Sequence, residues 1–424
     1  WYNTKGKVPQ SQAIREVLGI LDAMAIFDGA EHPIFARVGK HDEDIYIDLG
    51  NREWEAVRIA PDGWEVVPSE DVPVRFQRAT GVLPLPYPTR GGDLEDLRKV
   101  VNLPQKEFWV LSVAWLLQSF HPDGPYPILV VNGEQGSAKS ALAKSLRRLI
   151  DPNVAELRGA PGDEHDIAIG AENSWVQAYD NMSGVPPWLG DILCTLATGG
   201  GRSCRKLYTD SEEVLLDFKR PVMLNGIDEM TARGDLMDRS IILRLPRIEK
   251  SNRRSEKAVF SELDDIRPGV FGALLDIVAC GLRNLPDIHL DELPRMADFA
   301  EWIVACEEAL PWEKGDFIKV YDKNQSEAIA SMVEDDDFAT AIVNYVIEKG
   351  EICDSPGIIL KTMCEYAGVS RTRPPMGWPK VARGCRNKLD RLAPALRGLG
   401  FGIEVLPRTK AMRGVRIWKK EEER

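Results

Sequence analysis

An apolar run, a glycine-containing loop and a helix-patterned segment follow one another near the middle of this chain. The apolar run at residues 128–131 reads Ile-Leu-Val-Val, which is typical of a strand buried on both faces of a sheet. The loop at residues 133–140 reads Gly-Glu-Gln-Gly-Ser-Ala-Lys-Ser, and residues 141–149 then carry alanine and leucine at helical spacing. Strand, loop and helix in this order predict an α/β fold.

The loop matches the phosphate-binding pattern G-x-x-x-x-G-K-[ST] except at the second glycine, which is Ala138. In such a loop the backbone N–H groups converge on phosphate oxygens, a lysine reaches the outer phosphates and a hydroxyl helps to hold Mg²⁺. We expect Ala138 to be tolerated if its φ angle is negative. The opposing interpretation is an ordinary strand-to-helix connection. The predicted ATP-binding residues are Gly133, Glu134, Gln135, Gly136, Ser137, Ala138, Lys139 and Ser140.

Two further predicted strands end in polar residues that suit the same site. One strand, residues 175–179, precedes Asp180 and Asn181, and a later one ends at Asn225. A carboxylate beside a phosphate loop binds Mg²⁺ directly or through water, so Ser140 and Asp180 are the predicted metal ligands. The Asn225 amide is expected to orient the attacking water. The alternative for Asp180 is an aspartate in a plain β-turn.

Arg239 stands immediately before a third apolar run, residues 240–245. We expect this arginine to reach the nucleotide site of a neighbouring subunit as an arginine finger, with Arg233 as the alternative candidate. The opposing interpretation is that Arg239 only pairs with Asp235 on its own helical turn.

A basic segment follows three glycines in residues 197–210. It contains Arg202, Arg205, Lys206 and Tyr208. Basic groups hold phosphates and an aromatic ring stacks on a base, so these four residues are predicted to contact single-stranded DNA. The alternative is a solvated basic turn.

Together these motifs resemble the P-loop ATPase core of superfamily 3 helicases in the AAA+ group. They are most similar to the helicase-like ATP-binding proteins of phages and integrated mobile elements, which are often joined to a primase. The resemblance covers about residues 95–330. It implies a hexameric ring that hydrolyses ATP with Mg²⁺ at its subunit interfaces. Lys139 and Ser140 would then contact the phosphates, Asp180 would bind magnesium and Asn225 would sense the γ-phosphate. It also implies that the basic segment is a hairpin that grips DNA in a central channel.

One residue departs from the pattern of that family. AAA+ enzymes usually carry glutamate after the magnesium aspartate, where this chain has Asn181. An amide cannot accept a proton, so hydrolysis uses another carboxylate, is slow or is absent. The functional alternatives are therefore an ATP-dependent DNA helicase or translocase and an ATP-gated DNA-binding initiator. A small-molecule P-loop kinase is disfavoured by the basic segment.

Charge is distributed unevenly along the chain. The net charge is −12, yet residues 361–420 hold 15 Lys or Arg and three acidic residues. A basic end on an acidic body is typical of a local contact with a polyanion. The pattern of this end, three helices followed by two strands, predicts a winged helix, with Lys410 and Arg413 on DNA phosphates. The alternative is a winged helix that contacts only protein.

Three domains are expected: a β-rich α+β unit at residues 1–90, the ATPase core with helical flanks at 91–330 and the winged helix at 331–424. A Pro/Gly-rich segment, residues 83–92, marks the first boundary. The expected partners are single-stranded and forked DNA, further copies of the chain and a primase. Seven cysteines without a C-x-x-C pair suit a reducing cytoplasm, and no apolar stretch is long enough to span a membrane. Because the sequence begins with Trp1, we expect it to be part of a longer protein.

Overall fold

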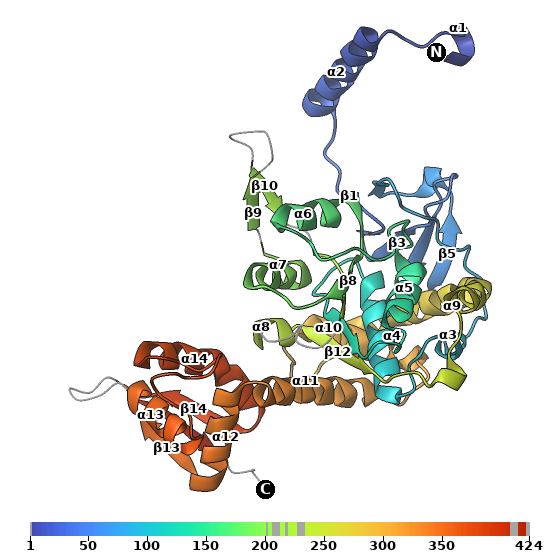
Figure 1. The fold of residues 1–424 in the computed structure, drawn as a ribbon. Helices are drawn as coiled ribbons and strands as arrows, with labels where there is room; N and C mark the ends of the chain where they lie inside the picture. Colours follow the sequence, from blue (N-terminus) through green and yellow to red (C-terminus); the bar gives the residue numbers. More distant parts are fainter. Residues whose placement is uncertain are drawn as a thin grey trace.

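The computed structural model describes residues 2–200, 202–205, 213–216, 219–226, 234–407 and 414–420. Its centre is a four-stranded parallel sheet with the strand order β12-β7-β11-β8 (Figure 1). The apolar runs predicted from the sequence form these strands. They are β7 (Ile128–Gly133), β8 (Gln177–Met182), β11 (Val222–Gly226) and β12 (Ser240–Leu245).

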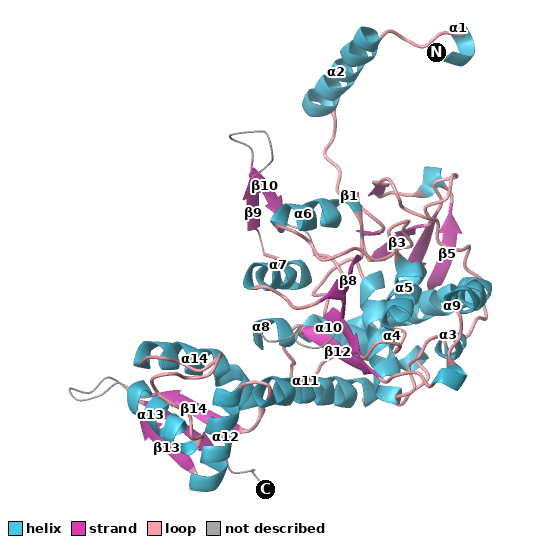
Figure 2. Ribbon diagram, in the orientation of Figure 1, coloured by secondary structure: helices cyan, strands magenta, loops and turns pink. Residues whose placement is uncertain are grey.

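Helices cover both faces of this sheet, which is why its strands are apolar on both sides. Leu129 and Val131 belong to a hydrophobic cluster with the helices of one face, whereas Ile128 and Val130 belong to a cluster with the helices of the other. The first face carries α4 (Lys106–Phe120), α5 (Lys139–Ile150), α9 (Glu256–Asn284) and α10 (Ala297–Cys306), and the second α6 (Glu164–Asn173), α7 (Pro187–Thr198) and α8 (Gly234–Met237). The fold is therefore a three-layer α/β arrangement (Figure 2).

The edge strand β12 is covered by α11 (Asp316–Glu334). The Asn324 side chain accepts a hydrogen bond from the Ile242 N–H at 3.0 Å and donates one to the Ile242 carbonyl at 2.7 Å. One amide thus replaces the missing neighbour strand at this position and satisfies backbone groups that an open edge would leave unpaired. The far end of α11 leads into the C-terminal unit (Figure 1).

An antiparallel sheet with the order β2-β3-β4-β5 packs against α9 on the N-terminal side of the chain. Trp64 on β5 donates a hydrogen bond from Nε1 to the Asp276 carboxylate on α9 at 2.8 Å. Preceding it, α2 buries none of its residues. The elements of this region are α1 (Tyr2–Lys5), α2 (Ser11–Asp28), β1 (Ile34–Phe35), β2 (Val38–His41), β3 (Asp44–Asp48), β4 (Ala56–Ala60), β5 (Gly63–Val67), β6 (Arg75–Phe76) and α3 (Glu95–Val100).

The Pro/Gly-rich segment at residues 83–92 contains no helix or strand, yet it is held firmly against its surroundings. The Thr89 N–H donates to the Pro268 carbonyl of α9 at 2.9 Å. A Cβ atom placed on Gly272 would lie 1.9 Å from the Thr89 carbonyl oxygen, so only glycine allows the two backbones to approach this closely. One hydrophobic cluster includes residues on both sides of this segment, such as Ile47 and Leu117. The domain boundary at residue 90 therefore remains a prediction from the sequence.

The C-terminal unit has a separate hydrophobic cluster. Its three helices and two of its strands follow the sequence-based expectation. The prediction missed β13, a four-residue strand that completes an antiparallel sheet of order β13-β15-β14. The elements are α12 (Asp337–Lys349), β13 (Glu351–Asp354), α13 (Pro356–Tyr366), α14 (Ala382–Gly398), β14 (Phe401–Val405) and β15 (Val415–Lys419). None of the described helices is long and apolar enough to cross a membrane.

The close approach at Gly272 gives a test of the 83–92 contact. We expect Gly272→Ala to lower the free energy of unfolding by about 3 kcal/mol, because the added methyl overlaps a backbone carbonyl that cannot rotate away. The control is Gly269→Ala on the same helix, where the nearest atom would be at an ordinary 3.4 Å. Denaturant unfolding of both variants measures the difference. Equal stability of the two variants would show that residues 83–92 are not in close backbone contact with α9.

Candidate functional site

A cleft of about 1280 Å³ opens where the carboxyl ends of β7, β8 and β11 meet the N-terminus of α5. Carboxyl ends of parallel strands at one sheet edge are the usual location of ligand sites in α/β folds. The cleft is lined by Lys99 to Asn102 and Pro104, Gln135 to Leu142, Lys144, Ser145, Asp180 to Ser183, Asn225, Gly226, Pro246 to Glu249, Asn252, Arg254, Glu256 and Val259.

The loop at residues 133–140 connects β7 to α5 as the sequence predicted, but Ala138 differs from the expectation. Its φ angle is +63°, in the left-handed region, whereas tolerance of alanine was expected at a negative φ. Gly136 is also left-handed, with a φ of +88°. A left-handed alanine is strained by about 1–2 kcal/mol, because its Cβ crowds the following carbonyl oxygen. Ala138 therefore adopts a backbone conformation that favours glycine, at a cost in stability.

Lys139 and Ser137 are both engaged with the loop itself. The Lys139 ammonium donates hydrogen bonds to the carbonyl oxygens of Gly133 at 2.5 Å and of Glu134 at 3.0 Å. The Ser137 hydroxyl, which is buried, donates to the Glu134 carbonyl at 2.9 Å. These bonds fold the loop into a compact turn at the first turn of α5, where helix N–H groups and the helix dipole favour an anion.

Ser140, Asp180 and Asn225 converge beside this turn from three different elements. The Ser140 hydroxyl oxygen lies 3.3 and 3.2 Å from the two carboxylate oxygens of Asp180. The Asn225 Nδ2 group donates to the same hydroxyl at 3.0 Å, whereas its buried Oδ1 atom has no hydrogen-bond partner in the described part of the chain. Residues 40 and 85 positions apart in sequence thus form one polar group.

These oxygen atoms suit a hard cation. Mg²⁺ usually takes one or two protein oxygens and completes its octahedron with phosphate oxygens and water, and the hydroxyl of Ser140 with the carboxylate of Asp180 is such a set. Within the residues that the structure describes, no group of three His, Cys, Asp or Glu side chains could hold a metal ion by itself. The donors therefore fit magnesium carried with a nucleotide better than a metal held only by protein.

Asp180 and Asn181 occupy a β-bulge in β8. Leu224 of β11 pairs with Tyr179 and Gly226 pairs with Met182, so two residues on β8 stand opposite one on β11. Asn181 has a φ of +56°, and its N–H donates to the Asp180 carboxylate at 2.9 Å. Asparagine tolerates this left-handed conformation better than most residues. The sequence predicts that this strand ends before Asp180, whereas β8 extends through Asp180 to Met182.

Arg239 does not line the cleft of its own chain. Its Nη1 atom donates to the Asp235 backbone carbonyl at 2.7 Å, and its buried Nε atom has no hydrogen-bond partner among the described residues. The alternative candidate, Arg233, lies outside the described residues. The position of Arg239 away from the cleft leaves a role toward a neighbouring subunit as a prediction.

The predicted DNA-contacting segment contains an antiparallel strand pair, β9 (Arg202–Arg205) and β10 (Glu213–Leu216). Arg202 is paired with Leu216 and Arg205 with Glu213 along the backbone. The pair lies at the edge of the molecule beyond α6 and α7 (Figure 1). Four predicted DNA-contacting residues, Lys206, Tyr208, Lys410 and Arg413, lie outside the described residues.

Sequence reasoning missed the walls of the cleft. Asn102, between α3 and α4, donates from Nδ2 to the carbonyls of Ser137 at 3.1 Å and Pro246 at 3.4 Å, and so joins the loop to the segment after β12. The Ile248 N–H donates to the Gly136 carbonyl at 3.2 Å. No motif marks Asn102. The one sequence signal for these walls is general: residues that follow a strand of a parallel sheet tend to lie beside a site at the carboxyl end of that strand.

A family described as actinomycete integrative conjugative element replication protein matches residues 94–314. The match covers more than half of the chain and includes every residue that lines the cleft. The chain belongs to this family. A second match, to the AICE RepA C-terminal domain, covers residues 338–423 and thus nearly all of the C-terminal unit. The family places the chain among the replication proteins of mobile elements. No curated protein matches the chain.

The overall fold is shared with a structure described as SCCmec type IV Cch, an active helicase. The likeness has a TM-score of 0.52 at 12% identity and covers 99% of this chain and 85% of that one. At this identity it shows a common fold alone. Weaker likenesses are to the NrS-1 C-terminal region (TM-score 0.37, 10% identity, 88% and 96% covered) and to JCV helicase (TM-score 0.28, 13% identity, 56% and 67% covered).

The left-handed backbone of Ala138 allows a test of its strain. We expect Ala138→Gly to raise the free energy of unfolding by about 0.5–1 kcal/mol, because relief of the Cβ clash outweighs the extra freedom that glycine gives the unfolded chain. The control is Ala141→Gly in α5, which should destabilise by up to about 1 kcal/mol. Thermal and denaturant unfolding measure both. A loss of stability in Ala138→Gly contradicts the strain argument.

Proposed function

We propose that this chain is an ATP-dependent DNA helicase or translocase that acts in the replication of a mobile element. The observation that carries the proposal is the convergence of Ser140, Asp180 and Asn225 beside the loop at the N-terminus of α5. Membership of a family of mobile-element replication proteins supports it. The helicase-like fold is consistent with it.

In this proposal the loop at residues 133–140 binds the phosphates of ATP through its backbone N–H groups. The Lys139 ammonium exchanges its loop carbonyls for the outer phosphates. Ser140 and Asp180 would hold Mg²⁺, which supplies charge neutralisation on the phosphates when bound. Asn225 donates to Ser140, and its buried Oδ1 atom, which has no partner among the described residues, would accept a hydrogen bond from the attacking water. Each of these roles uses a group already placed within a few ångströms of the others.

The motor would assemble as a ring, a hexamer, with Arg239 of one subunit reaching the ATP of the next. In this proposal Arg239 exchanges its bond to the Asp235 carbonyl for the phosphates bound by the next subunit. In this proposal β9 carries Arg202 and Arg205 to single-stranded DNA in the channel, and Lys206 and Tyr208, which lie outside the described residues, are further predicted contacts. Forked DNA is the substrate that this activity implies, and a primase is a further proposed partner.

An ATP-gated initiator with weak or absent hydrolysis is the second candidate, and Asn181 favours it. Three carboxylates line the cleft, those of Asp180, Glu249 and Glu256. Glu256 is paired with Lys144 at 2.6 Å, whereas the Glu249 side chain makes no hydrogen bond or ion pair within the described residues. Glu249 is therefore the carboxylate available as a general base if the protein hydrolyses ATP.

The two candidates differ in turnover. We expect the wild-type protein to hydrolyse ATP. We expect Asp180→Ala to lower kcat at least about 100-fold, because the variant lacks the carboxylate beside Ser140 that would hold Mg²⁺ at the reacting phosphates. The control, Asp265→Ala, removes an exposed carboxylate of α9 that does not line the cleft. Steady-state ATPase assays with and without single-stranded DNA, and unwinding of a forked duplex, measure the outcome. Wild-type turnover no higher than that of Asp180→Ala, with ATP still bound, supports the initiator.

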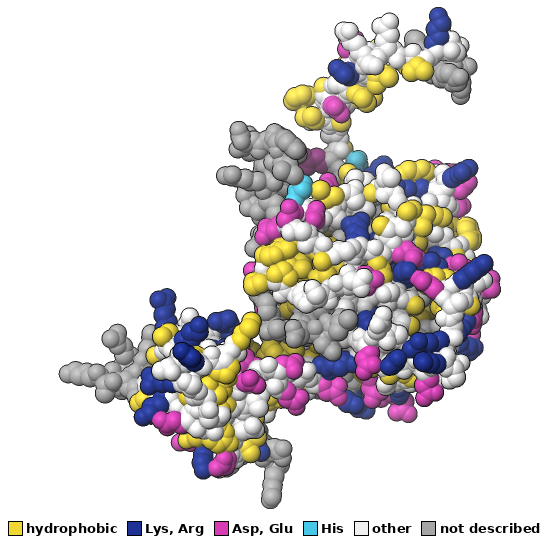
Figure 3. Space-filling view, viewed as in Figure 1, with side chains coloured by type: hydrophobic (Ala, Val, Ile, Leu, Met, Phe, Trp, Pro, Cys, Tyr) yellow, Lys and Arg dark blue, Asp and Glu magenta, His cyan; other side chains and the backbone are white. Residues whose placement is uncertain are grey.

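The C-terminal unit is proposed to be a winged helix that binds duplex DNA through α14. One face of this helix exposes Arg383, Arg391 and Arg397, and Lys and Arg side chains gather over it (Figure 3). Arg386 differs because it is paired with Asp390 at 2.9 Å. The three exposed arginines supply the phosphate contacts on the side where the sequence is most basic.

Salt dependence tests this surface. We expect the triple variant Arg383→Ala, Arg391→Ala, Arg397→Ala to bind duplex DNA more weakly, and to reduce the slope of log K against log salt by about 2–3, because each phosphate contact releases about one counterion. The matched control replaces Lys314, Lys319 and Lys323, around and on α11, by alanine. Fluorescence anisotropy at several salt concentrations measures the slope. An unchanged slope in the arginine variant assigns α14 to protein contacts.

A further inference from the structure

We propose that Arg37, which belongs to the N-terminal β-rich unit, is a positioning residue for the nucleotide site. It acts through the Asp151 carboxylate, which joins the end of α5 to the start of β8. This inference rests on the proposed function, because it concerns the binding of ATP with Mg²⁺ at the cleft. It assigns a role to a unit of the chain in which the sequence shows no chemical signature.

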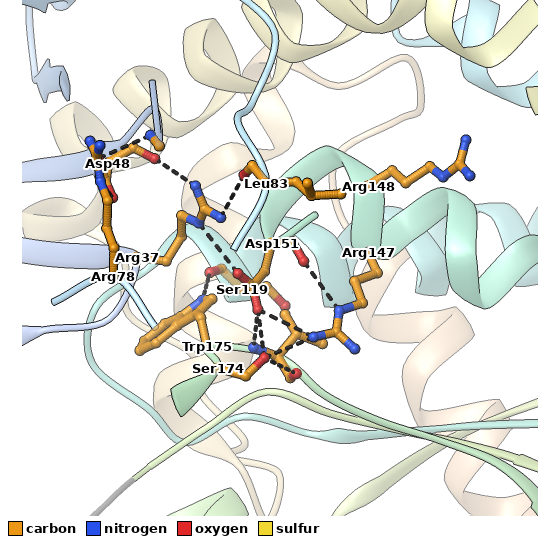
Figure 4. Close-up of polar contacts among 12 residues, drawn as sticks. Arg37, Asp48, Arg78, Leu83, Ser119, Arg147, Arg148, Asp151, Ser174 and Trp175 are labelled. Atoms are coloured by element: carbon orange, nitrogen blue, oxygen red, sulfur yellow. Dashed lines mark hydrogen bonds and ion pairs between the residues drawn. The ribbon is translucent and has the colours of Figure 1, made fainter. Parts of the chain in front are cut away.

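Arg37 is fully buried and makes three hydrogen bonds in different directions (Figure 4). Its Nη1 atom donates to the Asp48 carbonyl and its Nη2 atom to the Leu83 carbonyl, each at 3.0 Å. Its Nε atom donates to the Asp151 carboxylate at 3.3 Å. Two bonds fix the guanidinium to the N-terminal unit and the third crosses to the core, so the arginine carries a contact between the two.

Asp151 directly follows α5, and its carboxylate reaches the residues before β8. The oxygen that is not bonded to Arg37 accepts hydrogen bonds from the Val176 N–H at 2.9 Å and from the Ser174 hydroxyl at 3.0 Å. Arg147 of α5 completes the group, with Nη2 donating to the same hydroxyl at 2.8 Å. The carboxylate therefore fixes the spacing between the C-terminal end of α5 and the N-terminal end of β8.

The opposite ends of these two elements carry the candidate site. Ser140 in the first turn of α5 meets Asp180 of β8 at 3.2 Å. The helix between its two ends is about 18 Å long at 1.5 Å per residue. A rigid helix held at one end by Asp151 transmits a shift at that end to Ser140, so the separation of the two magnesium ligands depends on the buried group at the far end.

Arg37 supplies one of the two positive charges beside the Asp151 carboxylate. Two fully buried guanidiniums, those of Arg37 and Arg147, share the Asp151 carboxylate, and burial lowers the pKa of Arg147. Without Arg37 the remaining cation is Arg147, whose Nη2 atom lies 3.7 Å from the carboxylate on the α5 side. Loss of one partner leaves the buried carboxylate less well compensated, which favours a shift toward the remaining cation. Because Arg147 Nη2 and the Val176 N–H both lie beside the same carboxylate oxygen, such a movement would change the contacts by which Asp151 holds the start of β8.

The experiment compares binding of a fluorescent ATP analogue with and without Mg²⁺ in the full chain. We expect Arg37→Met to reduce the Mg²⁺-dependent gain in affinity about 10-fold, the lower end of the range for residues that orient metal ligands, because Arg37 acts on Ser140 only through Asp151 and α5. Affinity without Mg²⁺ should stay within about twofold of wild type. The control is Arg58→Met, which removes a paired arginine from β4 of the same sheet without contacting α5. Arg37→Lys, which keeps the charge but not the fork, should recover part of the gain.

Each outcome bears on the inference. A folded Arg37→Met protein with the wild-type Mg²⁺ effect overturns it, and so does an equal loss of affinity with and without Mg²⁺, which indicates a general structural role. If Arg37→Met does not fold, Ser174→Ala decides, because it removes only the hydroxyl that bridges Asp151 and Arg147. We expect a smaller loss of the Mg²⁺ effect in that variant, and a wild-type effect overturns the inference. A wild-type chain that binds no nucleotide overturns the proposed function itself.

Discussion

The parallel direction of the four central strands is the constraint on which the candidate site depends. Because β7, β8 and β11 run the same way, the residues at their carboxyl ends meet at one edge of the sheet. The loop after β7, Asp180 on β8 and Asn225 on β11 therefore lie together although they are far apart in sequence. Antiparallel strands would have placed Asp180 or Asn225 at the opposite edge. The apolar filling of both faces, in turn, is what allows a parallel sheet to persist.

Buried charge ties the rest of the chain to that sheet. Arg37 and Asp151 are 114 positions apart, yet both are nearly inaccessible to solvent and lie in contact. Removal of two charges from water is costly, so this pair is weak evidence for stability by itself. The pair instead contributes specificity of arrangement. The three donors of the Arg37 guanidinium point in fixed directions, so they accept only one arrangement of the N-terminal sheet against α5. The glycines at residues 92 and 272 add a second, steric restriction at α9.

Patterns in the sequence were sufficient for much of the core because they are local. The run at residues 240–245 predicted β12 to the residue, and Asn225 falls in β11 as expected. The same reasoning could not give the φ angle of Ala138 or the bulge at Asp180, because both are set by the neighbouring strand and helix and not by the residues alone. Proline and glycine in residues 83–92 predict a domain boundary, because both residues are typical of linkers. In this fold its Gly92 permits close packing on α9.

The bulge in β8 also bears on the difference between this chain and ATPases that carry glutamate at the position of Asn181. In a regular strand an acid at that position would need only a change of side chain. Here the backbone is left-handed, with a φ of +56°, and a glutamate would carry the strain that asparagine largely avoids. A substitution of glutamate for Asn181 would therefore place a side chain on a left-handed backbone and would not restore a regular strand. In the proposed hydrolysis the proton acceptor would come from another wall of the cleft, where Glu249 lies on the segment that the Ile248 N–H joins to the loop at Gly136.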